Sequence, residues 1–472
     1  MPTTKSRFKW CLLLAILSLA SCDDAQEEEI SSRDRDSGIH SRQRSLDDIL
    51  ESGRLVVVTR NAPTTWYIDQ HDQPAGPEYE LVESFAAALG VEVDYRLEST
   101  VGDILGRLEQ NTGDLAAAGL TITPERRQQF RFGPAYMDVT QQVVCRRDRV
   151  QPEEIEELIG LDISVIGDSS YSETLQHLKD TGYPELEWTQ LENISTEQLL
   201  YEVWQGAIDC TVADSSIVDI NRRYYPELIA PLNLRREEQL GWVMPKGAKK
   251  LANAVDKWMT EYRRSGQLAT WYEKYFGYFE KFDYVDIRAY IRRIDKRFPK
   301  YSQYFREAAE KYDLPFTLLA AQGYQESHWD PHAKSPTGVR GIMMLTQNTA
   351  RAMDVKNRLD PKQSISGGAR YLARMRQRFR EEVTEPDLTW LSLAAYNVGR
   401  GHMHDAQVLA RQKDLSPYHW KDIKQVLPLL ADKRYYRKLK YGYARGMEPV
   451  RYVGRIREYQ HILEGESVGQ QP

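Results

Sequence analysis

The sequence predicts a chain of two parts, an α/β domain with two lobes followed by a mainly helical domain. Short β-branched runs alternate with helical segments from about Leu46 onwards, and such alternation is typical of an α/β domain with largely parallel strands. A second set of strands begins at Ile163, which predicts a second lobe and a cleft between the two. Further along the chain, apolar residues recur at helical spacing, and the length of 472 residues accommodates two or three domains.

The first segment has the layout of a secretory signal. Lys5, Arg7 and Lys9 precede an apolar run over residues 11–20 that is too short to span a bilayer. We therefore expect a signal peptide over residues 1–21 and export to the periplasm. Residues 22–44 hold almost no apolar side chains, so they predict a flexible tether.

Cys22 ends the sequence Leu19-Ala-Ser-Cys, which resembles a bacterial lipobox and implies that the sulfur of Cys22 is acylated. The alternative is cleavage nearby by a plain signal peptidase, without a lipid. A lipid implies attachment to the outer membrane, while Asp23 directly after the cysteine leaves the inner membrane open.

Residues 45–277 are predicted to form the α/β domain. The expected strands cover residues 55–59, 91–95, 115–119, 163–166 and 207–212, and the expected helices cover residues 80–89 and a segment that ends at Asn111. Beyond the first 22 residues only Cys145 and Cys210 remain, and they either pair in the oxidising periplasm or stay buried as free thiols. Neither has the Cys or His neighbours of a metal site, so we expect no metal and no cofactor.

One stretch of the α/β domain carries a family resemblance. Gly119-Leu-Thr-Ile-Thr-Pro-Glu-Arg-Arg127, followed by Phe132-Gly-Pro-Ala-Tyr136, resembles the periplasmic amino-acid-binding proteins of family 3, over roughly residues 45–276. The resemblance implies a periplasmic-binding-protein-like fold in which Arg126 binds a ligand carboxylate and Asp214 receives a ligand ammonium. The other implied ligand-binding residues are Trp66, Thr121, Ser169 and Ser170.

The residues alone leave alternatives for this site. Arg126 is also placed to pair with a neighbouring acid, and Asp214 to cap the helix that starts at Ser215. An α-amino acid and a muropeptide stem peptide both carry a carboxylate and an ammonium group, and the sequence does not select between them.

In the helical half, Glu326 is the candidate catalytic residue. Phe316, Leu319, Ala320 and Gly323 recur on one face of a predicted helix, and Glu326 follows on the same face. Apolar surroundings penalise the charged form of a carboxyl, so its pKa rises and it can act as a general acid near neutral pH. Taken alone, a solvated Glu at a helix end is the more common case.

Three ordered motifs surround this residue. Glu326-Ser327 is followed by Ser335-x-x-Gly-x-x-Gly-x-Met343 and then by Ala395-Tyr-Asn397. In this order they resemble the soluble-lytic-transglycosylase-like family, which implies a goose-type lysozyme-like fold over residues 278–465, with residues 466–472 as a tail. The resemblance implies that Glu326 is the catalytic acid and base, and the implied substrate-cleft residues are Ser327, Ser335, Gly341, Met343, Tyr396, Asn397 and Tyr452.

Two further positions qualify the resemblance. Arg451-Tyr-Val-Gly-Arg-Ile456 is similar to the last motif of the family and supplies Tyr452. Many members have Gln where this chain has Met344, so a side-chain amide that could bind substrate is missing. This departure puts one substrate contact in doubt and leaves the acid in place.

Together the two resemblances match the membrane-bound lytic murein transglycosylases of the F type over nearly the whole mature chain. They imply an enzyme that cleaves the MurNAc-β-1,4-GlcNAc bond of peptidoglycan without water and leaves 1,6-anhydromuramyl ends, with an N-terminal domain that regulates it. One alternative is a hydrolytic muramidase, for which Asp330 is the nearest second carboxylate. Another is a tethered solute-binding or glycan-binding sensor without catalysis.

Charge agrees with a peptidoglycan substrate. Residues 283–464 carry 33 Lys and Arg against 21 Asp and Glu, and a basic surface attracts the carboxylates of muramyl peptides. The alternative is a solvated basic face without a partner. Export and the absence of a recognition motif argue against nucleic acid as a partner. The expected partners are therefore glycan strands, a small ligand of the first domain, and a membrane.

Overall fold

The computed structural model describes residues 42–69, 73–278, 283–335 and 338–468, without the side chains of residues 235, 236 and 466–468. The predicted signal peptide, Cys22 and most of the predicted tether lie outside the described residues. Within these ranges, no helix is both long and apolar enough to cross a membrane.

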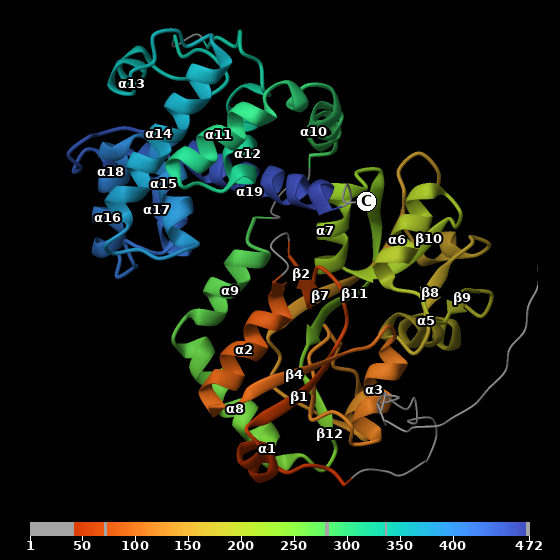
Figure 1. The fold of residues 1–472 in the computed structure, drawn as a ribbon. Helices are drawn as coiled ribbons and strands as arrows, with labels where there is room; N and C mark the ends of the chain where they lie inside the picture. Colours follow the sequence, from red (N-terminus) through yellow and green to blue (C-terminus); the bar gives the residue numbers. More distant parts are fainter. Residues whose placement is uncertain (1–41, 70–72, 279–282, 336–337, 469–472) are drawn as a thin grey trace, which may run out of the picture. The chain divides into compact units, whose positions relative to one another are not determined.

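The first lobe is built on a five-stranded sheet (Figure 1). β1 pairs in parallel with β4 and β5, whereas β12 runs antiparallel to both β5 and β6. The strands, in sheet order, are β4 (Glu92–Leu97), β1 (Arg54–Thr59), β5 (Leu115–Ala116), β12 (Val243–Pro245) and β6 (Phe130–Phe132). The helices of this lobe are α1 (Leu46–Ser52), α2 (Pro77–Leu89), α3 (Val101–Glu109), α4 (Pro124–Gln129), α8 (Lys249–Arg264) and α9 (Gln267–Tyr275), with a short β2 (Tyr67–Ile68) and β3 (Pro74–Ala75) hairpin.

The second lobe is inserted between β6 and β12. Its main sheet has the order β10-β7-β11, and all its pairs are antiparallel. The strands are β7 (Met137–Arg146), β10 (Cys210–Asp214), β11 (Leu228–Leu240) and the parallel pair β8 (Ser164–Ile166) and β9 (Thr189–Leu191). The helices are η1 (Ile155–Leu158), α5 (Ser170–Thr181), α6 (Thr196–Gln205) and α7 (Ser215–Tyr224).

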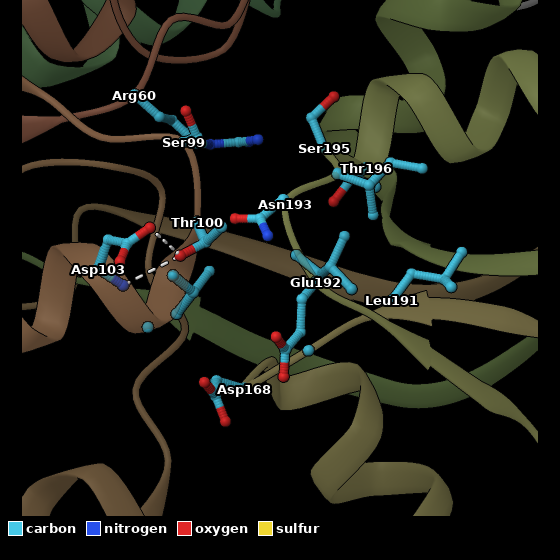
Figure 2. A pocket seen from close by; sticks show the side chains of 15 residues that line it. Arg60, Ser99, Thr100, Asp103, Asp168, Leu191, Glu192, Asn193, Ser195 and Thr196 are labelled. Atoms are coloured by element: carbon cyan, nitrogen blue, oxygen red, sulfur yellow. Dashed lines mark hydrogen bonds between the residues drawn. The ribbon is translucent and has the colours of Figure 1, made fainter.

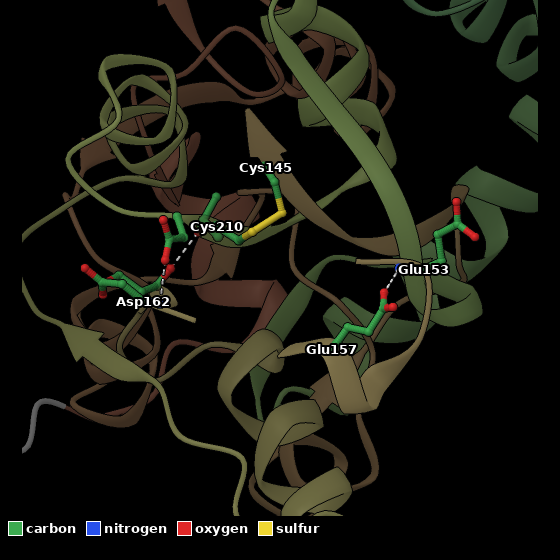
Figure 3. Close-up of a disulfide and its surroundings, with 8 residues drawn as sticks. Cys145, Glu153, Glu157, Asp162 and Cys210 are labelled. Carbon is green, nitrogen blue, oxygen red and sulfur yellow. Dashed lines mark hydrogen bonds between the residues drawn. A yellow bond between two sulfur atoms is a disulfide. The ribbon is translucent and has the colours of Figure 1, made fainter. Parts of the chain in front are cut away.

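Cys145 and Cys210 form a disulfide inside the second lobe (Figure 3). The two residues lie directly opposite each other on β7 and β10, and both are fully buried. The bond closes a segment of the chain with a sequence separation of 65 residues. Of the two alternatives that the sequence left open, the structure therefore has the paired one.

Two predicted strands differ most in extent from the observed ones. The strand expected over residues 207–212 covers residues 210–214, because Gly206 adopts φ 78° and ends α6 with hydrogen bonds to the carbonyls of Glu202 and Val203. The strand expected over residues 115–119 pairs only over residues 115–116, and Gly119 turns the chain with φ 65°. In each case a glycine in the left-handed region sets the boundary.

The second half is helical, as predicted. α12 packs against α11 and α19, and α15 packs against α14 and α19 around one buried core. The helices are α10 (Tyr284–Lys296), α11 (Ser302–Tyr312), α12 (Phe316–Ser327), α13 (Gln347–Ala352), α14 (Pro361–Phe379), α15 (Asp387–Val398), α16 (Arg400–Gln412), α17 (Trp420–Val426), α18 (Lys433–Tyr436) and α19 (Met447–Val468), with the short η2 (Phe298–Lys300) and η3 (Leu427–Ala431).

The described residues from Arg42 onwards form one compact unit, and α19 pairs with the α/β half through two buried ion pairs. Arg457 Nη1 lies 2.8 Å from Glu273 Oε1 on α9, and Arg223 Nε on α7 lies 3.0 Å from Glu458 Oε1. All four side chains are buried. Because a buried charge without its partner is costly, these pairs favour one arrangement of α19 against α7 and α9.

Candidate active site and ligand-binding site

Glu326 lies in the last turn of α12. Pro315 occupies the N-cap position, and His328 ends the helix with φ 53° in the left-handed region. Buried residues run from Thr317 to Tyr324 on nearly all sides of the helix, so α12 is a core helix rather than a surface helix with one apolar face. The sequence placed the helix correctly and underestimated its burial.

Glu326 is half-buried at the end of α12. Burial is the main cause that raises its pKa to about 8, and the hydrogen bond from Tyr452 opposes this rise. Tyr452 Oη donates to Glu326 Oε1 over 2.5 Å. With this pKa, Glu326 holds its proton near neutral pH, which is the state that a general acid needs.

Gln322 completes this arrangement and was missed by the sequence analysis. Its side chain is fully buried, and Nε2 donates to Tyr452 Oη over 3.1 Å. Because Gln322 precedes Glu326 by one helical turn, the spacing of four residues could have indicated a shared face. Gln322 thus orients the hydroxyl group that binds Glu326.

Two side-chain hydroxyl groups bind backbone carbonyls of the segment after α12. Ser327 Oγ donates to the carbonyl of Ile342 over 2.8 Å, and Tyr396 Oη donates to the carbonyl of Met343 over 3.1 Å. Gly341 has φ 83°, and a Cβ there would lie 1.8 Å from the carbonyl oxygen of Arg358. Only glycine fits this position.

The remaining predicted substrate residues are Ser335, Tyr396 and Asn397. Ser335 shapes the turn, since its Oγ accepts from the N–H of Val339. Tyr396 is half-buried on α15, and burial and the charge of Glu326 both raise the pKa of its hydroxyl. Asn397, the next residue, is exposed and available to a substrate. The structure therefore brings together Glu326, Ser327, Met343, Tyr396 and Tyr452 through direct or shared contacts.

Met344 and Asp330 have local roles. Met344 adopts φ 42° in the turn after Gly341 and is half-buried. Asp330 Oδ1 accepts from the N–H of His332 over 2.9 Å, and its own N–H donates to Ser327 Oγ. The carboxylate of Asp330 is thus engaged in the turn that follows α12.

In the α/β half, three predicted ligand residues meet between the lobes. Arg126 is buried, with Nη1 donating to the carbonyl of Thr121 and Nη2 to the carbonyl of Asp168 in the second lobe. Its Nε lies 3.7 Å from Glu173 Oε1. Ser170 Oγ donates to Thr121 Oγ1 over 3.3 Å. The neighbouring acid considered in the sequence analysis is therefore present.

Asp214 lies at the N-cap of α7 but makes no side-chain capping hydrogen bond. It is buried, its Oδ1 has no hydrogen-bond partner, and burial followed by the charge of Glu238 raises its pKa to about 7. It lines a cavity of about 10 Å³ with Arg60 and Glu78. A buried carboxylate oxygen without a donor is a site for a cationic group.

Two predicted residues have other contacts. The hydroxyl of Ser169 accepts from the N–H of Ser172 and donates to the carbonyl of Ile166, so it caps α5. The ring of Trp66 packs 6.3 Å from that of Tyr95 on β4. Trp66 lines neither the cavity at Asp214 nor the larger interlobe cavity at Arg60.

Arg60 is the residue of this half that sequence reasoning missed. It lines both the cavity at Asp214 and a larger one of about 290 Å³. Figure 2 shows Arg60 and Ser99 facing Asn193, Ser195 and Thr196 across the larger cavity. Arg60 Nη1 pairs with Glu197 Oε2 of α6 over 3.1 Å, so this contact also joins the lobes. Among the described residues, no group of three or more His, Cys, Asp or Glu side chains could hold a metal ion.

Two families match separate parts of the chain. Residues 55–278 match the family described as bacterial extracellular solute-binding proteins, family 3. Residues 303–418 match the transglycosylase SLT domain. The fold is therefore a periplasmic-binding-protein-like domain followed by a lysozyme-like domain, as the two resemblances implied.

Relatives match over the whole chain. Membrane-bound lytic murein transglycosylase F 2 of Alkalilimnicola ehrlichii is 45% identical over 461 residues, which cover 96% of this chain and 98% of the relative. Membrane-bound lytic murein transglycosylase F of Maricaulis maris is 42% identical over 468 residues, which cover 99% of this chain and 100% of the relative. Among solved structures, a mutant of ArgBP from T. maritima matches 49% of this chain and 99% of its own, with 24% identity and a TM-score of 0.45.

Proposed function

Because the chain belongs to the membrane-bound lytic murein transglycosylase F family, it is a lyase of peptidoglycan with a solute-binding domain, and we propose that Glu326 is its catalytic acid and base. The observation that carries this proposal is the half-buried carboxyl group of Glu326, which accepts a hydrogen bond from Tyr452. A carboxyl with a pKa of about 8 keeps its proton until it meets the glycosidic oxygen.

The reaction needs one carboxyl group for two proton transfers. Glu326 donates its proton to the glycosidic oxygen as the bond between C1 of the muramyl unit and O4 of the N-acetylglucosamine unit breaks. The carboxylate that remains takes the proton of the muramyl C6 hydroxyl, whose oxygen forms the new C1–O6 bond. The proton returns to Glu326, no water is consumed, and the product has a 1,6-anhydromuramyl end.

The surroundings of Glu326 support this route over hydrolysis. Two-carboxylate glycosidases need a second acid as a nucleophile or as a base for water. Asp330, the nearest candidate in the sequence, is held in its own turn by the N–H of His332. The two influences on the pKa of Glu326 are burial and the hydroxyl of Tyr452, not a second carboxylate.

We assign the other predicted residues to substrate binding and orientation. Tyr452 keeps the carboxyl of Glu326 in place, and Tyr396 holds the backbone at Met343. The exposed amide of Asn397 is available to an N-acetyl group of the glycan. Ser327, Ser335 and Gly341 give the turn between these residues its shape.

Mass spectrometry of fragments released from purified sacculi tests the catalytic assignment. The wild-type protein is expected to release 1,6-anhydromuramyl products, and Glu326→Gln, which keeps shape and removes the acid, is expected to release none. Reducing ends that carry an added water would instead identify a muramidase. Fragments released at the wild-type rate by Glu326→Gln would exclude Glu326 as the acid.

For the first domain, we propose a ligand with one carboxylate and one ammonium group, an α-amino acid or a stem peptide. Asp214 Oδ1 is buried without a donor and suits the ammonium, and Arg126 suits the carboxylate once it exchanges its carbonyl partners. Calorimetric titration with amino acids and stem peptides tests this. Asp214→Asn should abolish the heat of binding, and binding that survives it would exclude Asp214.

We further propose that the ligand of the first domain regulates cleavage, with residues 45–277 and 278–465 as the two domains. Asp214 is the N-cap of α7, and Arg223 near the other end of this helix pairs with Glu458 on α19, six residues after Tyr452. A shift of α7 on ligand binding would therefore reach the hydroxyl that holds Glu326. Cleavage rates with and without saturating ligand test this, and equal rates would exclude the coupling.

For localisation, we propose a periplasmic enzyme anchored to the outer membrane by a lipid on Cys22, with the inner membrane as the alternative. The sequence around Cys22 and the names of the relatives, which call them membrane-bound, support the proposal. Radiolabelled fatty acid should appear in the wild-type protein and not in Cys22→Ser. Equal labelling of both would exclude acylation at Cys22.

A further inference from the structure

An exposed group of aromatic residues precedes the last helix. The tyrosine loop, residues 432–447, holds four tyrosines and runs from α18 to the start of α19. Tyr441 is 47% exposed, Tyr443 is 57% exposed and Met447 is 44% exposed. Large apolar surfaces that remain in water are candidates for binding.

The exposed rings are held by a fixed backbone. The N–H of Tyr441 donates to the buried carboxylate of Asp405 over 2.9 Å, and the N–H of Ala444 donates to the carbonyl of Leu430. At Gly446, a Cβ would lie 1.6 Å from the carbonyl oxygen of Leu427, so only glycine allows this approach. A ring on a fixed backbone loses little conformational freedom when it binds.

Glycine also sets the position of the first ring. A Cβ at Gly401 would lie 2.6 Å from a ring carbon of Tyr441, so the ring packs directly on the backbone of α16. Gly401 follows Tyr396 by five residues, across the junction of α15 and α16. The tyrosine loop therefore contacts the start of α16, which directly follows the helix that carries Tyr396.

The direction of the helices places the loop at the Glu326 end of the core. α12 and α19 run antiparallel, since Tyr452 contacts Glu326 at one end and Glu464 accepts from Thr317 at the other. The chain that precedes Tyr452 therefore extends beyond the catalytic end of α12. Met447 starts α19 five residues before Tyr452, which corresponds to about 7.5 Å along the helix.

The tyrosine loop is also rich in basic residues. The tyrosine loop contains six Lys and Arg residues and one acidic residue, Asp432. Lys440 Nζ lies 5.5 Å from the ring centre of Tyr441. Glycan strands of peptidoglycan combine sugar rings, whose C–H faces pack on aromatic rings, with stem peptides that end in carboxylates. Both parts of such a strand match this surface.

We propose that Tyr441 and Tyr443 bind the peptidoglycan strand beyond the sugars held at Glu326, with the basic side chains of the tyrosine loop facing stem-peptide carboxylates. This assignment rests on the proposed function, because it extends the same substrate along the same surface. The two rings are positioning residues: they raise the affinity for long strands without taking part in proton transfer.

Cleavage of soluble glycan strands of increasing length by the full chain tests the proposal. For Tyr441→Ala and Tyr443→Ala, KM on long strands should rise about 5-fold for each ring, while kcat stays unchanged. The effect should grow with strand length and then level off. Tyr441→Phe and Tyr443→Phe keep the rings and should behave as wild type. Tyr201→Ala, which removes a similarly exposed ring from α6, should leave KM unchanged.

Thermal unfolding verifies that the alanine variants keep the wild-type melting temperature. An equal KM change at all strand lengths, or no change at any length, would overturn the proposal. Sedimentation with intact sacculi tests the proposed strand contact separately from the catalytic assignment. The inactive Glu326→Gln variant should co-sediment with sacculi, and adding Tyr441→Ala and Tyr443→Ala to it should abolish this binding. That result supports the strand contact even if the wild type forms no anhydro product. If the variant with both alanine substitutions still binds sacculi but no longer binds vesicles of anionic lipid, the two tyrosines contact a membrane instead.

Discussion

Tyr452, on the last helix of the chain, donates its hydroxyl hydrogen to Oε1 of Glu326 over 2.5 Å, across a sequence separation of 126 residues. This bond stabilises the ionised form of Glu326, while burial favours the protonated form more strongly. The balance leaves the pKa at about 8. Tyr452 on the last helix therefore lowers the pKa of Glu326, which belongs to the first of the three ordered motifs.

The activity is expected to fall as the pH rises through about 8, because Glu326 then loses the proton that it must donate. Tyr452→Phe removes the bond that lowers this pKa, so the decline should move to higher pH, and kcat should fall about 10-fold or more from lost orientation. A pH profile of kcat/KM measures both effects. Tyr459→Phe, on the same helix, is the control and should leave the profile in place.

Gln322→Met replaces the buried amide with an apolar side chain of similar size. The hydroxyl of Tyr452 then loses the donor that orients it, so we expect kcat to fall about 10-fold with KM unchanged. A shifted pH profile would distinguish this role from a merely structural one. An unchanged profile with reduced stability would assign Gln322 to the core alone.

Glu326→Gln should stabilise the folded protein at neutral pH. The usual pKa of this group is 4.5 and the folded value is about 8, so between these values the folded state holds a proton that the unfolded state has lost. The stability of the wild type therefore decreases across this window as the pH rises. Unfolding by denaturant at pH 5 and pH 8 should show that the advantage of the Gln variant grows with pH; a constant difference would contradict the raised pKa.

Glu273→Ala should destabilise the protein by about 3–5 kcal/mol, because it leaves the buried charge of Arg457 without its carboxylate partner and removes the same carboxylate from Lys424. Arg457 also lies over the ring of Trp390, 4.0 Å from its centre, and keeps that contact. Combining Glu273→Leu with Arg457→Leu should recover most of the loss. Glu448→Ala breaks an exposed pair with Arg445 and should cost less than about 1 kcal/mol. Denaturant unfolding compares the three variants with the wild type.

Replacing both Cys145 and Cys210 with Ser should lower stability by about 4 kcal/mol, since the disulfide closes a long segment of the unfolded chain. The loss should be confined to the second lobe, where both sulfurs are buried. Hydrogen exchange of β7 and β10 measures it. Wild-type exchange rates in these strands would show that packing alone holds the lobe.

The sequence predicted the fold where local signals and tertiary structure agree. The strand at Leu55 and the helix at Phe316 were placed to within a few residues, because their periodicity matches their burial. The strand at Cys210 was misplaced by three residues at its start, since the backbone of Gly206 decides where α6 ends. Such a left-handed glycine is visible only once its conformation is known.

The candidate site divides in the same way. Glu326, Tyr396 and Tyr452 follow from ordered motifs, and the structure brings them together. Gln322 carries no motif, and its role depends on a contact with a residue 130 positions away. Arg60 was missed for the same reason, because its partner Glu197 belongs to the other lobe. Long-range contacts of this kind leave no trace in local spacing.

One helix serves both halves of the chain within seven consecutive residues. Tyr452 holds the acid, and Arg457 and Glu458 pair with Glu273 and Arg223 of the solute-binding half. Exchanging the first domain for one from another protein therefore removes the partners of both ion pairs on this helix. A chimera should fold in the native register only if the incoming domain supplies an acid on the helix that replaces α9 and a base on the helix that replaces α7.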